Sequence, residues 1–271
     1  MIMKNHLFFM IIILFGISCH PSAHKKVSSD IPSLETQTLH LDSTDFDMCK
    51  QAECPRLDIS YLDVREDDDV SQRINQRNKI ELIDLFQQYQ EEEIPTPTVR
   101  AAVAGFIREY LNFKQNYPTS VGVYEASIDQ KILDQNQQTV VLETQFHFYT
   151  GGAHGIYGTH YHNFDAKTGR LLSLTDLISD IPALTAYAEK EFRKKHEVPA
   201  GDRLTDHGFF FQNDEYILPE NIAVTSKEVI LLYNPYEAAS YAQGQIQLDL
   251  PIKQVRQWLV HPELNSSHAK P

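Results

Sequence analysis

The sequence predicts an α+β protein. Two helical patterns come early in the chain, and a strand-rich region with interspersed helices follows them, so helices and strands are segregated and do not alternate regularly. Hydrophobic residues make up 42% of the 271 residues, which is enough to build a core and argues against an unfolded chain. We expect an N-terminal strand and two helices packed with antiparallel strands, then a second α+β module with hairpins and a C-terminal helix.

Alternating and helical periods define the elements of the first half. Apolar and polar residues alternate in the expected strands, whereas apolar residues recur every 3.6 positions in the expected helices. Asp67, Asp68 and Asp69 supply capping and first-turn carboxylates to the first helix. Residues 129–138 are polar and are expected to form a turn region. The predicted elements are a strand at 56–64, helices at 67–92 and 99–117, and strands at 121–126, 139–150 and 155–165.

The second half continues with shorter elements. Residues 165–170 have the composition of a hairpin turn, and Thr175 can cap a short helical turn. The aromatic block Phe209–Phe211 is expected in the core. The remaining predicted elements are a helix at 182–195, a hairpin of strands at 222–224 and 229–233, a strand at 246–250, and a closing helix at 251–260 that begins with Pro.

The first eighteen residues have the features of a bacterial lipoprotein signal peptide. Lys4 precedes an apolar run at 7–17, which is shorter than the roughly 20 residues that span a membrane. The run ends in small residues before Cys19 and resembles a lipobox, in which the cysteine is lipidated and becomes the first residue of the mature protein. A plain secretory signal is the alternative. Basic residues directly after Cys19 favour a periplasm-facing anchor in the bacterial cell envelope.

Residues 19–48 are polar and lack a sustained period, so we expect a tether. Lipidation of Cys19 leaves Cys49 and Cys54 as a pair. In an oxidising compartment such a pair indicates a disulfide, which here closes a small loop and therefore stabilises modestly. A redox or metal pair is the alternative, but the spacing is not that of a CxxC motif.

The charge excludes one class of partner. The chain has 24 Lys and Arg against 37 Asp and Glu, a formal net charge of −13, which becomes −14 when Lys4 is removed with the signal peptide. Nucleic-acid binding depends on a basic surface that releases counterions, so we expect no nucleic-acid partner. An acidic surface instead raises the encounter rate with a cationic protein.

Several motifs in the second half of the chain resemble one bacterial family. They are Gly151–Gly155, Asn163–Gly169, Leu174–Leu177, and Tyr233–Ala239 with Tyr241–Gly244. In this order they resemble the RsiV-type ectodomain, and the stretch from Leu57 through Ile74 resembles the N-terminal module that accompanies PdaC-type peptidoglycan deacetylases. The resemblance covers roughly residues 50–262.

This resemblance implies an extracytoplasmic α+β binding module. The RsiV-type ectodomain binds lysozyme, so a lysozyme-type cationic protein or a peptidoglycan component is the expected ligand. No anti-sigma segment and no deacetylase catalytic domain is recognisable, so those activities are not carried over. The predicted organisation is a signal peptide at 1–18, a tether at 19–48, a PdaC-like module at 49–153, an RsiV-like module at 154–262 and a tail at 263–271.

Four residues are candidates for ligand binding. Gly151 and Gly152 permit positive φ or close backbone approach, and they would present His154 at a loop tip. The alternative is a tight connection whose histidine bonds a backbone carbonyl. Tyr236 follows Asn-Pro and could either cover the sheet end or belong to a recognition surface.

Histidines are dense between His147 and His162. His160 and His162 would point to one face of a strand, and imidazole is a common ligand of zinc and copper, so His154, His160 and His162 are candidate metal ligands. A metal-dependent or accessory envelope hydrolase is therefore the alternative function, and an exposed polar strand face is the alternative to both. No GxSxG motif or triad spacing marks a nucleophile, so we assign no catalytic residue and no cofactor and expect a binding protein.

Overall fold

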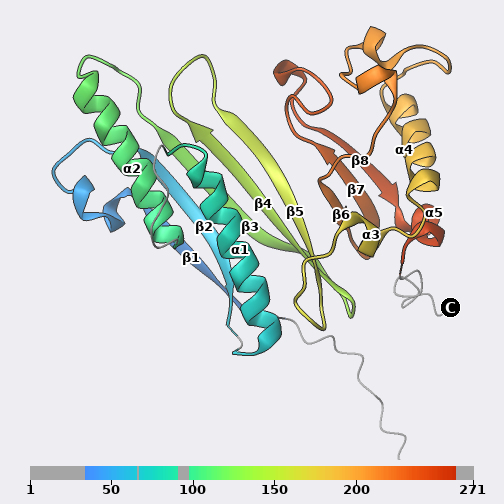
Figure 1. Cartoon of the computed structure of the whole chain (residues 1–271), viewed down its shortest axis with the longest axis horizontal. Coiled ribbons are helices and arrows are strands. Elements are labelled where there is room, and N and C mark those ends of the chain that lie inside the picture. Colours follow the sequence, from blue (N-terminus) through green and yellow to red (C-terminus); the bar gives the residue numbers. More distant parts are fainter. Residues whose placement is uncertain (1–33, 66, 91–97, 261–271) are drawn as a thin grey trace, which may run out of the picture. The chain divides into compact units, whose positions relative to one another are not determined.

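The computed structural model describes residues 34–65, 67–90 and 98–260, which belong to one compact unit (Figure 1). The signal peptide, Cys19 and the tail at 263–271 lie outside the described residues. The predicted α+β class is confirmed, because helices pack with two largely antiparallel sheets and do not alternate regularly with the strands. Within the described ranges, no helix has the length and apolar character needed to span a membrane.

The first sheet has five strands in sequential order. They are β1 (Thr36–Asp42), β2 (Arg56–Val64), β3 (Glu125–Gln135), β4 (Thr139–Tyr149) and β5 (Ile156–Asp165). Neighbours pair antiparallel except β2 and β3, which are parallel. A parallel pair needs a long crossover, and the two helices between β2 and β3 provide it.

Helices α1 (Asp69–Gln87) and α2 (Val99–Asn116) cover one face of this sheet (Figure 1). Each begins at a side-chain cap: Asp68 accepts a hydrogen bond from the Ser71 amide, and Thr98 from the Ala101 amide. Their apolar faces meet the sheet around fully buried aromatic rings. The Phe86 and Phe148 rings pack edge to face with centroids 5.1 Å apart, a preferred aromatic geometry.

The second sheet consists of β6 (Ile222–Val224), β7 (Glu228–Tyr233) and β8 (Ile246–Pro251), all antiparallel. Its core contains α4 (Ile181–Lys195), whose Phe192 is fully buried, together with the short helices α3 (Leu174–Leu177) and α5 (Ile252–Val255). Phe209 and Phe211 are buried as predicted, but Phe210 is 54% exposed. The backbone is extended there, so alternate side chains point in opposite directions.

Asparagine side chains join the two sheets. Strand β5 is an edge of the first sheet, and its free backbone groups bond to amides from the second sheet. The Thr159 and Tyr161 amides donate to Asn234 and Asn221 at 2.9 and 2.8 Å. In the opposite direction, the Asn163 amide donates to the Ile222 carbonyl at 2.6 Å and its oxygen accepts from the Val224 amide at 2.9 Å. The edge is thus satisfied without continuous backbone pairing.

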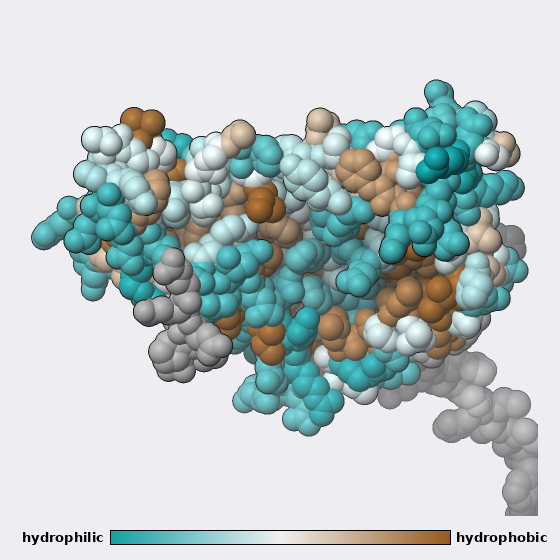
Figure 2. All heavy atoms as spheres, turned by 45° about the horizontal axis from the view of Figure 1, so that its top comes forward, coloured by the Kyte–Doolittle hydropathy of each residue, from teal (hydrophilic) through white to brown (hydrophobic). Residues whose placement is uncertain are grey.

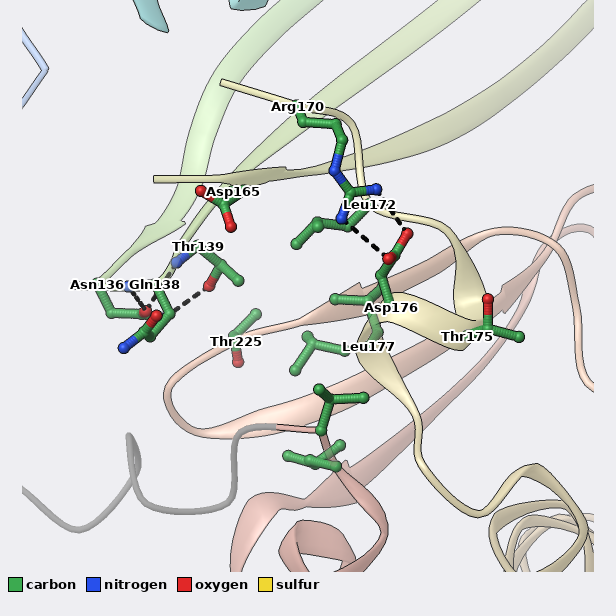
Figure 3. A pocket seen from close by; sticks show the side chains of 13 residues that line it. Asn136, Gln138, Thr139, Asp165, Arg170, Leu172, Thr175, Asp176, Leu177 and Thr225 are labelled. Carbon is green, nitrogen blue, oxygen red and sulfur yellow. Dashed lines mark hydrogen bonds and ion pairs between the residues drawn. The ribbon is translucent and has the colours of Figure 1, made fainter. Parts of the chain in front are cut away.

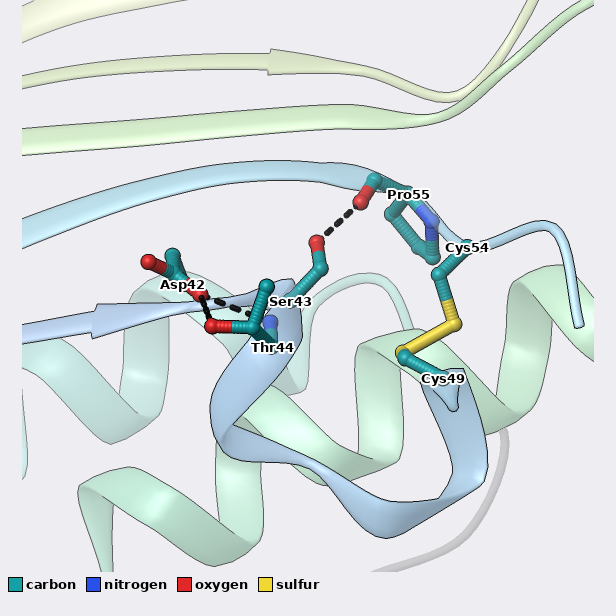
Figure 4. The surroundings of a disulfide bond; sticks show 6 residues. All are labelled: Asp42, Ser43, Thr44, Cys49, Cys54 and Pro55. Carbon is teal, nitrogen blue, oxygen red and sulfur yellow. Dashed lines mark hydrogen bonds between the residues drawn. A yellow bond between two sulfur atoms is a disulfide. The ribbon is translucent and has the colours of Figure 1, made fainter. Parts of the chain in front are cut away.

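Cys49 and Cys54 form a disulfide beside the connection between β1 and β2 (Figure 4). In the same connection Asp42 accepts a hydrogen bond from the Thr44 amide, and the Ser43 hydroxyl donates to the Pro55 carbonyl. Together these contacts hold the β1–β2 connection against the helical layer, where Cys49 and Cys54 pack on the apolar core.

Three expectations about the chain's segments need correction. The tether at 19–48 includes strand β1, because residues 36–42 pair with β2 and Leu39 and Leu41 pack on the core. The boundary at 153/154 falls inside the β4–β5 hairpin, so the first sheet extends to Asp165. Residues 129–135 continue β3 because β4 pairs with them across a bulge, which leaves only 136–138 as the turn.

Candidate functional site

Exposed aromatic rings from two distant segments meet at one end of the fold. His154 lies in the β4–β5 loop, and Tyr236 and Tyr241 lie between β7 and β8. The His154 and Tyr241 rings stack with centroids 3.8 Å apart, and the Tyr236 ring lies 5.7 Å from Tyr241 and 6.5 Å from His154. Two sequence-predicted candidates, His154 and Tyr236, therefore come together although 82 residues separate them.

The two glycines shape the β4–β5 loop. Gly151 and Gly152 have φ values of 103° and 92°, a conformation that residues with a Cβ rarely adopt. The Tyr149 hydroxyl donates to the Gly152 carbonyl at 3.1 Å, and the Tyr241 hydroxyl donates to the Gly155 carbonyl at 2.9 Å. These contacts fix the loop and place His154 at its exposed tip.

His154 is hydrogen-bonded to the backbone and is also exposed. Its Nδ1 lies 3.0 Å from the Gly155 carbonyl oxygen, as expected for a histidine that bonds the backbone. Its Nε2 faces the Tyr236 hydroxyl at 3.4 Å, and the residue stays exposed. The contact with Gly155 therefore orients the ring without burying it.

Tyr236 is held in a strained backbone conformation. Its φ is 75°, and its side chain is 59% exposed. The turn is fixed by hydrogen bonds from the Tyr236 amide to Ala239 and from the Glu237 amide to Asn234. A left-handed conformation costs a non-glycine residue about 1–2 kcal/mol, and little packing offsets that cost here. Tyr233, by contrast, is buried, with its hydroxyl donating to the Ile217 carbonyl.

We call Tyr149, His154, Tyr157, Tyr236 and Tyr241 the aromatic loop cluster. Tyr157 also belongs to it: the Tyr157 and Tyr241 rings pack edge to face with their centroids 5.6 Å apart. In Figure 2 the end of the molecule that carries the β4–β5 loop is turned toward the viewer. Hydrophilic residues surround scattered hydrophobic ones on this face. Such rings offer apolar faces together with hydroxyl and imidazole hydrogen-bonding groups.

Three members of the cluster, Tyr149, Tyr157 and Tyr241, were not among the predicted site residues. Tyr149 and Tyr157 flank the glycine loop, which is the signal in the sequence that could have indicated them. Tyr241 lies in a recognised motif, but only the tertiary structure places its ring against His154.

His160 and His162 face a buried carboxylate instead of His154. Glu81 of α1 contacts His160 through one oxygen and lies 3.4 Å from His162 Nε2 through the other. Burial raises the pKa of Glu81, but the His160 hydrogen bond and the nearby charges of His162, His160 and Arg77 outweigh it and lower that pKa. Burial lowers the pKa of His162 against the raising effect of Glu81. A glutamate on the apolar face of the helical pattern was the missed signal.

The candidate metal set does not assemble. His154 stacks on Tyr241, whereas His160 and His162 lie farther along β5 and contact α1. Among the described residues, no three His, Cys, Asp or Glu side chains are placed to hold a metal ion. The reason is the strand itself: His160 and His162 lie four and six residues beyond the start of β5 at Ile156, roughly 13 and 20 Å along the strand from the loop that carries His154.

A cavity of about 220 Å³ lies at the other end of the fold, where turns of both sheets meet (Figure 3). Leu172, Leu177 and Thr225 surround its centre, and Arg170 forms a bidentate ion pair with Asp176 at its rim, with both distances 2.9 Å. The Arg170 and Ser173 hydrogen bonds hold the pKa of Asp176 well below its usual range. Thr225 caps its own turn by accepting from the Glu228 amide, so these polar groups serve the local fold.

Two family models match the chain. One is described as Deacetylase PdaC and matches residues 48–157, and the other is described as a protein of unknown function, DUF3298, and matches residues 175–253. The chain therefore contains a PdaC-type domain followed by a DUF3298 domain. The predicted pairing of a PdaC-like module with a second module is therefore confirmed. The DUF3298 match contains β6 and β7 and two members of the aromatic loop cluster, Tyr236 and Tyr241.

Sequence similarity to an individual protein supports the PdaC–DUF3298 assignment. The chain is 24% identical over 147 residues to the peptidoglycan-N-acetylmuramic acid deacetylase PdaC of Bacillus subtilis, and the match covers 53% of this chain but only 30% of that relative. Peptidoglycan is a polymer of the bacterial cell envelope, so this match associates the family with the envelope.

Two solved DUF3298 structures have the same fold. A Bacteroides fragilis protein has a TM-score of 0.66 at 22% identity and covers 87% of this chain and 98% of its own. A Pseudomonas aeruginosa protein has a TM-score of 0.60 at 19% identity and covers 84% and 95%. The architecture described above, with both sheets, is therefore shared with these DUF3298 proteins.

Proposed function

We propose that this PdaC–DUF3298 protein is a lipid-anchored envelope protein that binds the glycan of peptidoglycan through the aromatic loop cluster. The observation that carries the proposal is the convergence of the His154, Tyr236 and Tyr241 rings, with Tyr236 kept exposed in a strained backbone. Strain of this kind persists only where the surroundings enforce it, and it is common at ligand-binding sites.

The chemistry of the cluster suits amino sugars. A pyranose ring has an apolar face that can stack on a tyrosine or histidine ring, while hydroxyl and N-acetyl groups need hydrogen-bond partners at the edge. The Tyr236 hydroxyl and His154 Nε2 lie at the exposed edge of the cluster and can supply them. The match to a peptidoglycan deacetylase supports this substrate class.

Binding is tested by cosedimentation of the detergent-purified full chain with insoluble peptidoglycan. Tyr236→Asn and His154→Ala should each weaken binding about tenfold, the loss typical of an important aromatic contact. Tyr117→Asn is the matched control because Tyr117 is 61% exposed at the end of α2. Binding of both Tyr236→Asn and His154→Ala at the affinity of the unmodified protein would contradict the proposal.

The anchor is proposed at Cys19. Lipidation there would leave about sixteen residues before β1 begins at Thr36, enough to extend roughly 55 Å at most. Metabolic labelling with a fatty acid should mark the chain, and Cys19→Ala should abolish the label and release the protein from membranes. A labelled Cys19→Ala protein would contradict this assignment.

The formal net charge of −13 favours a second candidate, recognition of a cationic envelope protein such as lysozyme. Immobilised full-length protein should retain lysozyme at low ionic strength and lose most of it at physiological salt, because salt screens surface charges beyond roughly 8 Å. Failure to retain lysozyme at low salt would eliminate this candidate.

A further inference from the structure

An arginine-lined groove runs between α1 and the turn that follows β5. It has a volume of about 550 Å³, and its described lining includes Arg73, Arg77 and Arg170 but no carboxylate. Ile80, which is 39% exposed, and Leu171 supply apolar surface. The groove continues along α1 into a second hollow of about 610 Å³ that shares Gln76 and Ile80 and is also lined by Lys79 and Asp84. On a chain with a net charge of −13, this concentration of guanidinium groups is unusual.

The walls of the groove are fixed by close backbone packing. Gly169 has a φ of 68°, and a Cβ there would lie 2.4 Å from the Val70 carbonyl oxygen, so the turn sits directly on the first turn of α1. Arg73 Nη1 also donates to the Thr168 carbonyl at 3.0 Å. The groove therefore exists without a ligand, and its guanidinium groups are held near their binding positions.

The three arginines differ in how many of their N–H groups already donate hydrogen bonds. Arg170 is committed to Asp176 through both of its terminal nitrogens. Arg73 uses one of its five N–H groups on Thr168 and is otherwise exposed. The Arg77 Nε is buried without a hydrogen-bond partner, and Arg77 lines the groove while its charge acts on Glu81, which His160 and His162 share. Arg73 and the part of Arg77 that lines the groove are thus the guanidinium groups that face a ligand.

We propose that this groove binds a short carboxylate-bearing peptide, with Arg73 and Arg77 receiving its carboxylates and Ile80 and Leu171 its apolar groups. A guanidinium matches a carboxylate in planar, bidentate geometry. A peptide fits better than an anionic membrane surface or a long polyanion, because the other acidic faces of the molecule would repel an extended negative surface. The groove is independent of the proposed glycan site: β5 separates the two by roughly 30 Å.

The test uses the full chain in detergent and a labelled four-residue peptide that contains two glutamates, at low ionic strength. The double variant Arg73→Gln/Arg77→Gln should weaken binding at least tenfold. The matched control, Arg108→Gln/Lys253→Gln, removes the same charge from exposed positions on α2 and α5 and should bind as the unmodified protein does. A C-terminally amidated peptide with glutamine in place of both glutamates has no carboxylate and should not bind.

Two further measurements keep the result specific. Arg73→Lys/Arg77→Lys keeps the charge but loses the planar fork, so it should bind more weakly than the unmodified protein and more strongly than the glutamine variant. Three results would each overturn the proposal. The first is an equal loss of peptide affinity in the groove variant and the control, and the second is the absence of peptide binding at low salt. The third is tighter binding to phosphatidylglycerol vesicles or inorganic phosphate than to the peptide. Thermal unfolding of each variant shows whether the fold is retained.

Discussion

At the scale of single residues, Tyr236 is one of four described residues other than glycine that have a positive φ; the others are Glu197, Asn213 and Asp214. Gly151, Gly152 and Gly169 adopt left-handed conformations that suit glycine, whereas Tyr236 adopts one at a cost and leaves its ring exposed. A residue chosen for stability at position 236 would be Gly or Asn. The proposed glycan contact of its ring accounts for a tyrosine at this position.

Replacing Tyr236 should separate stability from binding. Tyr236→Asn should leave the free energy of unfolding unchanged or raise it by up to about 1 kcal/mol, because Asn tolerates the left-handed conformation. Tyr233→Asn, at a buried position, should lose about 3 kcal/mol or more. Urea unfolding followed by circular dichroism measures both. A loss of more than 1 kcal/mol in Tyr236→Asn would assign the ring a structural role instead.

Gly169 should be the glycine most sensitive to substitution. Gly169→Ala combines a φ of 68° with a Cβ 2.4 Å from the Val70 oxygen, and it should lower the free energy of unfolding by about 2–4 kcal/mol. Gly122→Ala is the control, since no atom lies within 4 Å of its Cβ position. Equal stability of the two variants by urea unfolding would show that the turn does not dock on α1 as described.

At the scale of elements, a buried ionic contact links α1 to the edge strand β5. Glu81 bridges His160 and His162 beneath α1, next to Arg77 on the same helix. The Gln130 and Asn78 side chains bond each other farther along the same interface at 2.7 Å. Helix and sheet therefore meet partly through polar pairs, of which the Glu81–histidine contact depends on protonation, and not only through apolar contacts.

This contact should make the protein less stable in acid. The pKa of His162 is lowered from 6.5, so its contribution is present above pH 6.5 and is lost as pH falls toward its folded pKa. The pKa of Glu81 is lowered from 4.5, so its contribution is lost at still lower pH. His162→Gln should therefore flatten the fall in urea midpoint between pH 6.5 and 5, measured at half-unit steps. An unchanged slope would show that His162 does not control it.

At the scale of the whole molecule, the two sheets are coupled through amide side chains. Asn163 satisfies the Ile222 carbonyl and the Val224 amide, and the side chain is 4% exposed. Backbone groups left unpaired in such a place cost about 1–3 kcal/mol each. This junction allows the PdaC-type and DUF3298 parts to behave as one compact unit.

Asn163→Ala should weaken this coupling. We expect a loss of about 2–4 kcal/mol and a broadened or two-step unfolding transition, because the first sheet and the second sheet then unfold less cooperatively. Differential scanning calorimetry measures both quantities. Asn116→Ala, an exposed position at the end of α2, should leave a single transition near the original temperature. A single unshifted transition in Asn163→Ala would refute the coupling.

The sequence by itself determined the element types of this protein. The alternation in 56–64 and 246–250, the helical period of 99–111 and the Asp, Thr and Pro positions at helix starts all depend on residues close in the chain. The glycine pair and the Asn-Pro turn also indicated His154 and Tyr236 as candidate site residues. These are local signals, and local physics is sufficient to interpret them.

The tertiary structure alone decided which of these residues meet. The polar segments that became β1 and the second half of β3 are strands because partner strands pair with them, which no local pattern shows. The same is true of the site: β4 and β5 bring the glycine loop to Tyr236 and Tyr241, and they carry His160 and His162 away from His154 to Glu81. Contacts across tens of residues depend on strand register and packing, and those are fixed only when the whole chain folds.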